Sequence, residues 1–150
     1  MIGFNLYKAP PFLLEKINNI CSLLWQGKKE YEQVASNITD KDLRRTMLAL
    51  AQESNQYACE LLSQIHTLGG ILEVKKINEP EVRDEIKNLN DENEIRTFCK
   101  MNENKMVDAY QEILNESFAH EGLKKMIRYQ LNEMLCVFMQ VKQLGSLKFH

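Results

Sequence analysis

The chain has 150 residues, with 19 Lys or Arg against 21 Asp or Glu, so its formal net charge is −2. This balance excludes a strongly basic nucleic-acid-binding protein and an acidic disordered chain. Apolar residues make up 44%, while Gly and Pro number only 6 and 3. One helical domain over residues 1–150 is therefore expected, rather than a fold of many short strands.

Helical periodicity begins near the N-terminus. Apolar residues from Leu13 to Ile38 recur at alternating steps of three and four, which is typical of a helix packed in a bundle. The Pro10-Pro11 pair stands at its start, where a helix tolerates proline. Residues 1–9 form a tail that is apolar for a free terminus, and no signal peptide is expected there because a basic region followed by a long apolar run is missing.

Three further segments repeat this periodicity and are predicted to be helices: residues 39–68, 92–116 and 123–144. Thr39 or Asp40 is expected to cap the first of these, since both residue types accept hydrogen bonds from first-turn N–H groups. Gly69-Gly70 is expected to end the same helix, and Gly145 to end the last.

Residues 70–91 interrupt the periodicity, and a short helix near residues 80–88 is expected within them. A connection of this length extends to about 70 Å, enough to cross the bundle and set the third long helix parallel to the second. We therefore predict an all-α four-helix bundle with a long crossover connection. Residues 79–94 carry seven acids against Arg83 and Lys87, which indicates a solvated connection or, alternatively, a docking surface for a basic partner.

Each apolar seam is interrupted once near the middle of its helix. The interruptions are Gly27, Ser54, Asn102 and Gln130, and the glutamates on the flanks beside them are Glu30, Glu53, Glu103 and Glu133. Bundle proteins build metal and cofactor sites from such mid-height residues, although a hydrogen-bonded layer that fixes register has the same pattern. The predicted mid-bundle polar layer consists of Gly27, Ser54, Asn102, Glu103, Gln130 and Glu133.

The sequence contains a Gly shortly before a Tyr, a Leu-Ala-x-Glu helix and a terminal Leu-Gly-Gly. These features occur in the stretches LLWQGKKEYEQVASNITDKDLRRTMLALAQESNQYACELLSQIHTLGG and NENKMVDAYQEIL. In these features residues 12–145 resemble the ferritin-like superfamily, and within it a bacterial, rubrerythrin-related family of four-helix bundles without assigned function. The resemblance implies a ferritin-like fold. Metal-binding members of that superfamily hold two iron or manganese ions with a Glu on two helices and Glu-x-x-His on the other two.

This sequence departs from that ligand pattern because the imidazoles are missing. The corresponding pairs are Glu53-x-x-Gln56 and Glu133-x-x-Cys136, and the three histidines, His66, His120 and His150, are not expected near mid-height. We therefore expect no metal, no cofactor and no catalytic residue. The four cysteines form no Cys-x-x-Cys pair and are expected to be reduced and mostly packed.

The function predicted from the sequence is that of a cytoplasmic, non-catalytic binding or structural module, with a homodimer as the candidate assembly and with neither nucleic acid nor membrane as a partner. The alternative is a degenerate di-iron or di-manganese oxidoreductase or metal-binding protein, which requires Glu103 and Glu133 to face each other across the core. A third hypothesis is small-molecule binding beside Gly27 and Ser54, where side chains are absent or small.

Overall fold

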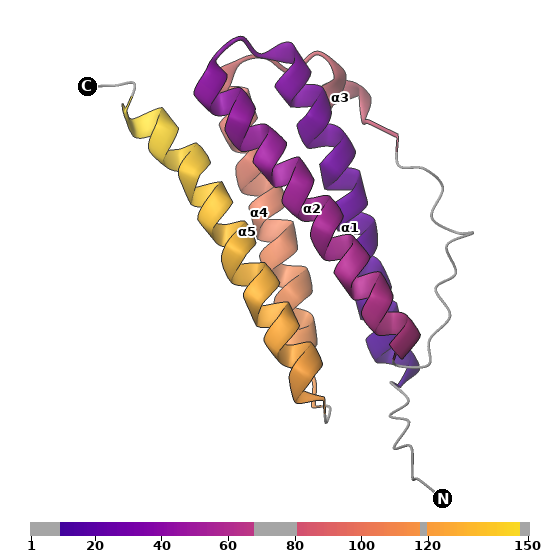
Figure 1. The fold of residues 1–150 in the computed structure, drawn as a ribbon. Coiled ribbons are helices and arrows are strands. Elements are labelled where there is room, and N and C mark those ends of the chain that lie inside the picture. Colours follow the sequence, from indigo (N-terminus) through magenta and orange to yellow (C-terminus); the bar gives the residue numbers. More distant parts are fainter. Residues whose placement is uncertain (1–9, 68–80, 118–119, 148–150) are drawn as a thin grey trace, which may run out of the picture.

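The computed structural model describes residues 10–67, 81–117 and 120–147, and these ranges contain five helices and no strand (Figure 1). The helices are α1 (Pro11–Asn37), α2 (Lys41–Thr67), α3 (Asp84–Lys87), α4 (Glu92–Leu114) and α5 (Glu121–Leu147). The four long helices lie side by side as a bundle, and the one-turn α3 sits at the end where α1 ends (Figure 1). The predicted all-α four-helix bundle is confirmed.

The order of the helices in space confirms the crossover. Figure 1 shows α1 antiparallel to α2, α4 antiparallel to α5, and α4 running in the same direction as α2. The chain therefore returns along the whole bundle between Thr67 and α4. The predicted tail 1–9, most of the connection (residues 68–80, with Gly69-Gly70), and residues 118–119 and 148–150 lie outside the described residues.

Side chains at the helix starts satisfy backbone N–H groups that have no partner within the helix. Asp40 Oδ1 accepts hydrogen bonds from the N–H groups of Asp42 and Leu43 at 3.0 and 3.1 Å, so Asp40 acts as the predicted cap. Asp91 accepts from the N–H of Glu94 at the start of α4. His120 Nδ1 accepts from the N–H of Leu123 at 2.9 Å in the first turn of α5.

Three predicted helix bounds are corrected. The short helix covers only Asp84–Lys87 rather than residues 80–88, because the backbone is extended at Arg83. The next helix ends at Leu114, two residues earlier than predicted. The last helix does not end at Gly145 but continues to Leu147, because a single glycine within a helix costs only about 1 kcal/mol and does not by itself stop it.

The core contains tyrosines at mid-height as well as aliphatic residues. Leu, Ile and Val side chains from the four long helices are buried throughout the bundle, and the largest fully buried side chains include Tyr31, Tyr57, Tyr110 and Phe138. The Tyr31 ring makes edge-on contacts with Phe98 and Phe138, at centroid distances of 5.7 and 6.4 Å. Within the part of the chain that the structure describes, no helix is long and apolar enough to span a membrane.

Candidate functional site at mid-height of the bundle

The structure distributes the predicted polar layer over three groups of contacts. Gly27 and Asn102 lie with Tyr31 between α1 and α4. Gln130 and Glu133 lie with Tyr57 between α5 and α2, near Ser54. Glu103 lies on the side of α4 that faces the end of α5. The six residues therefore do not converge on one point.

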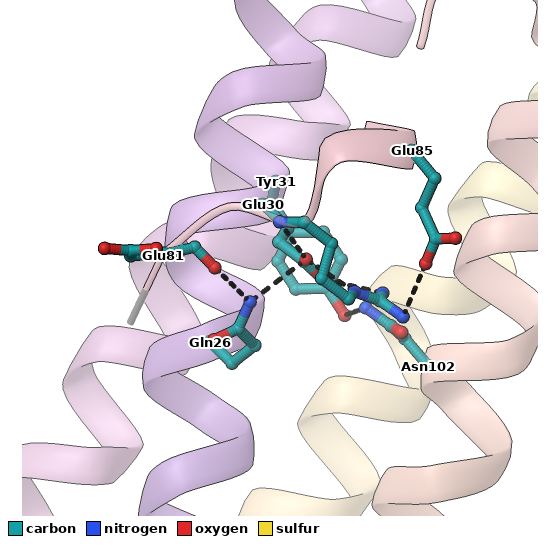
Figure 2. Close-up of polar contacts among 7 residues, drawn as sticks. Gln26, Glu30, Tyr31, Glu81, Glu85 and Asn102 are labelled. Atoms are coloured by element: carbon teal, nitrogen blue, oxygen red, sulfur yellow. Dashed lines mark hydrogen bonds and ion pairs between the residues drawn. The ribbon is translucent and has the colours of Figure 1, made fainter. Parts of the chain in front are cut away.

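Glu30, on α1, is buried to 1% exposure and is saturated with hydrogen bonds (Figure 2). Arg83, from the connection before α4, donates from Nε and Nη2 to the two carboxylate oxygens at 2.8 and 2.9 Å. The Arg83 backbone N–H and Gln26 Nε2 donate as well, at 3.3 and 3.0 Å. Burial alone would raise the pKa of Glu30, but these hydrogen bonds outweigh it and hold that pKa below its usual value of 4.5. A guanidinium thus supplies the cation that this carboxylate requires.

Side-chain amides of α1 bind the same connection through its backbone. The pairs are Gln26 with the carbonyl of Glu81, Gln33 with that of Lys87, and Asn37 with those of Lys87 and Leu89, at 2.8–3.1 Å. The three amides are seven and four residues apart, so they share one face of α1. Residues 81–89 therefore follow α1 closely and bring Arg83 to Glu30.

Three buried tyrosines occupy the centre of the bundle. Asn102 Nδ2 donates to the Tyr31 hydroxyl at 3.1 Å, the Tyr57 hydroxyl donates to Glu53 at 3.1 Å, and the Tyr110 hydroxyl donates to Gln130 at 2.8 Å. Burial raises the pKa of each of these phenols. The centre is thus filled by neutral, hydrogen-bonded side chains.

The inward-facing pair on α2 is Ser54 and Tyr57, both buried, whereas Gln56 is exposed. Ser54 donates only to the carbonyl of Leu50 in its own helix, at 2.7 Å. On α5, Cys136 is likewise exposed. The positions where the resemblance places Glu-x-x-His therefore do not direct a second ligand into the bundle.

Glu53 on α2 lies near enough to Glu133 on α5 for the charge of Glu133 to act on its pKa. One Glu53 oxygen accepts from Tyr57, while its Oε2 is buried and has no partner among the described residues. Burial raises the pKa of Glu53, and the charge of the half-buried Glu133 raises it further, although the Tyr57 hydrogen bond acts in the opposite direction. The surroundings of Glu53 therefore disfavour its charged form.

Glu103 does not face Glu133. Its side chain, 10% exposed, pairs with Lys142 of α5 at 3.0 Å and with Lys100 of its own helix at 3.4 Å. Lys142 lies nine residues after Glu133, which is roughly 13 Å along a helix. The arrangement that the metal-binding alternative requires, with these two glutamates opposed, is not present.

The remaining metal-ligand types are dispersed. Across residues 10–67, 81–117 and 120–147, no three His, Cys, Asp or Glu side chains are grouped so that they could hold a metal ion. His66 lies in the last turn of α2 and His120 precedes α5; His150 lies outside the described residues. Because Glu30 and Glu103 are already neutralised by Arg83 and lysines, the donor set does not fit a di-metal centre.

The cysteines only partly follow the expectation that they are packed. All four are free; Cys21 and Cys99 are buried, whereas Cys59 and Cys136 are exposed. The last two lie on outer helix faces because they fall outside the apolar seams of α2 and α5.

Sequence reasoning missed Arg83, Gln26, Tyr57 and Tyr110 as members of the polar contacts. Tyr57 was on the predicted seam of its helix, where periodicity identifies a buried side chain but not its hydrogen-bond partner. Arg83 gave a weak signal, as one of two basic residues in an acidic stretch.

A search of solved structures finds a close match in architecture. The matching structure is described as a dodecameric thioferritin in the bacterial domain, the bacterioferritin-related protein from Bacteroides fragilis. The TM-score is 0.75, and the match covers 91% of this chain and 86% of the other. The chain has a ferritin-like fold.

This confirms the fold that the resemblance implied. The two sequences are only 17% identical, so the match establishes the fold of this ferritin-like bundle and nothing about its activity. No family model and no curated protein matches the chain.

Proposed function

We propose that this ferritin-like bundle is a non-catalytic binding or structural module, in which a layer of hydrogen-bonded tyrosines takes the place of a di-metal centre. The observation that carries the proposal is the pairing of Glu30, a buried mid-height carboxylate, with Arg83. We also propose, from the sequence resemblance of residues 12–145, that the chain is related to the rubrerythrin-related bacterial bundles. Its four free cysteines support our further proposal that it is cytoplasmic.

The energetics of the Glu30 pair support this proposal. A metal ion bound at Glu30 would have to displace the Arg83 guanidinium, which makes two charge-assisted hydrogen bonds to the carboxylate. The positive charge of the displaced Arg83 would then repel the metal ion. Tyr31, Tyr57 and Tyr110 are poor replacements for imidazole because burial keeps their phenols protonated.

Anaerobic titration with Fe(II), and separately with Mn(II), tests the proposal. We expect no stoichiometric binding to the wild type and none to Glu53→Gln. A competing chelator of known affinity sets the concentration of free metal in each titration. Two equivalents bound by the wild type and lost in Glu53→Gln would contradict the proposal.

Self-association is the assembly that we propose, with a homodimer as its smallest form. Large apolar side chains between 41% and 56% exposed support it: Phe12, Leu48, Met101, Tyr129 and Met139. The similar thioferritin is itself described as dodecameric. Light scattering on the intact chain and on a chain lacking residues 1–9 tests the proposal, and a monomer in both samples would contradict it.

A second candidate function is a degenerate metal-binding protein or oxidoreductase based on carboxylates alone. One observation favours it: Glu53 has a buried oxygen without a partner among the described residues, and Glu133 lies near enough to raise its pKa. A cation between these two carboxylates would relieve their repulsion. The same Fe(II) and Mn(II) titrations distinguish this candidate from the first.

A further inference from the structure

A cavity of about 140 Å³ opens on the side of the bundle between α1 and α4, beside Gly27. Three buried polar side chains line it: Glu30, Tyr31 and Asn102. Leu23 and Met106 add apolar surface, and the exposed Lys105 stands at the opening. The cavity therefore combines polar groups on its floor with apolar walls, and small-molecule sites likewise join apolar surface to a few placed polar groups.

The floor of the cavity has an unused donor. The Tyr31 hydroxyl accepts a hydrogen bond from Asn102 Nδ2, and no acceptor for its own proton is found among the described residues. Because the pKa of Tyr31 is raised by burial, this proton remains in place. Tyr31 can therefore donate to an oxygen placed in the cavity, and the Asn102 carbonyl oxygen can accept from it.

The charge that faces the cavity comes from Glu30, Arg83 and Lys105. Arg83 is paired with two carboxylates, with Glu30 through the double hydrogen bond and with Glu85 at 3.2 Å (Figure 2). Lys105 has no ion-pair or hydrogen-bond partner in the part of the chain that is described. Lys105 is thus the one cation lining the cavity that has no ion pair among the described residues, so it is available to a carboxylate placed at the opening.

Lys105 and Asn102 are three residues apart on α4, so they share one helix face and their Cβ atoms are about 5 Å apart. We propose that the cavity binds a small monocarboxylate carrying a hydroxyl or oxo group. The carboxylate pairs with Lys105, and the second oxygen bonds to Tyr31 and Asn102. The proposal rests on the proposed function, because it names a ligand class for a binding module in which Glu30 stays paired with Arg83.

NMR titration of the ¹⁵N-labelled full-length chain with 3-hydroxybutyrate tests this site, in buffer containing EDTA so that metal ions are excluded. We expect saturable, millimolar binding, as is usual for a ligand of so few atoms, with shifts at the amides of Gly27, Asn102 and Lys105. Butyrate, which lacks the hydroxyl, and 3-hydroxybutyramide, which lacks the charge, are each expected to bind at least about fivefold more weakly.

Two variants assign the contacts. Lys105→Gln is expected to weaken 3-hydroxybutyrate at least about fivefold, whereas the control Lys125→Gln, at an exposed lysine on α5, leaves binding unchanged. Tyr31→Phe is expected to remove the preference for 3-hydroxybutyrate over butyrate while leaving butyrate binding unchanged.

Absence of saturable shifts up to about 50 mM ligand, or equal affinities for Lys105→Gln and Lys125→Gln, would overturn the proposal. The two proposals fail separately. Stoichiometric Fe(II) binding in the metal titration would overturn the proposed function, while a silent NMR titration of a protein that binds no Fe(II) would overturn the ligand site alone.

Discussion

Arg83 forms a two-pronged ion pair with Glu30, fifty-three residues earlier in the chain, with N–O distances of 2.8 and 2.9 Å. The planar guanidinium matches the two oxygens of the carboxylate, which a lysine ammonium cannot do. The pair joins the connection before α4 to the middle of α1, and it neutralises a carboxylate that is almost completely buried.

Replacing Arg83 with Ala is expected to destabilise the fold by about 2 kcal/mol, because Glu30 is then a buried charge without a cation. The effect is set below that of a pair buried on both sides because Arg83 is 38% exposed. Urea denaturation at pH 7 measures it. Arg45→Ala, at an exposed position of α2, is the matched control, and equal stability of the two variants would contradict the assignment.

The same pair predicts an acid-dependent stability. Because the pKa of Glu30 is lowered on folding, its contribution is present above the ordinary value of 4.5 and is lost as the pH falls through the folded value. Glu30→Gln should therefore be less stable than the wild type at pH 7, and the gap should close in acid. A gap that stays constant from pH 7 to pH 3 would exclude this linkage.

Glu53 should show the opposite dependence. Burial and the nearby Glu133 raise its pKa, so its contribution to stability is present below 4.5 and is lost as the pH rises through the folded value. Glu53→Gln is expected to match or exceed the wild type in melting temperature at pH 7 and to flatten the decline above pH 4.5. Glu15→Gln, at an exposed site on α1, should leave the pH profile unchanged.

Removing the Tyr110 hydroxyl should leave the buried side-chain amide of Gln130 without a hydrogen-bond donor. Tyr110→Phe leaves Gln130 Oε1 without its 2.8 Å donor at 0% exposure, and a loss of about 1–2 kcal/mol is expected. A double-mutant cycle with Gln130→Leu, measured by urea denaturation, isolates the hydrogen bond. Strictly additive effects of the two substitutions would show that the bond contributes nothing.

A methyl group at Gly27 should conflict with Tyr31. A Cβ there would lie 3.0 Å from Tyr31 Cε2, and the ring is held by Phe98, Phe138 and Asn102. Gly27→Ala is expected to lose about 1 kcal/mol despite the better helix propensity of alanine. At Gly122 the nearest atom would be 3.4 Å away, so Gly122→Ala should be neutral or stabilising. Gly27→Ala should therefore lower the melting temperature, whereas Gly122→Ala should leave it unchanged or raise it.

Thiol labelling should divide the cysteines into two pairs. Burial, with a smaller contribution from a nearby group, raises the pKa of Cys21 and of Cys99 to about 12, so neither forms the reactive thiolate at neutral pH. Two equivalents of a chromogenic disulfide reagent should react quickly with the native protein, at the exposed Cys59 and Cys136, and four after unfolding in urea. Four fast equivalents in the native state would contradict the burial of Cys21 and Cys99.

The architecture could be predicted because it depends on periodicity and on length. The apolar spacing located the four long helices, and the length of residues 70–91 indicated the crossover. The polar contacts could not be predicted in the same way, because periodicity identifies the buried face of a helix but not the partner of each side chain. The sequence therefore indicated that Glu30 lies on the flank of its helix, whereas in the structure Glu30 is buried and paired with Arg83. Gly145 also misled, because a helix passes through a lone glycine at small cost.

Gln26, Gln33 and Asn37 hold the connection by its carbonyl oxygens rather than by its side chains. Every residue type has the same backbone carbonyl, so these hydrogen bonds depend on the path of the backbone and not on the side chains of the connection. Substitution of exposed side chains in residues 81–89 therefore leaves these bonds in place, provided that Arg83, Ile86 and Leu89 keep their inward contacts. The three α1 amides thus constrain the sequence of α1 more tightly than the sequence of the segment that they hold.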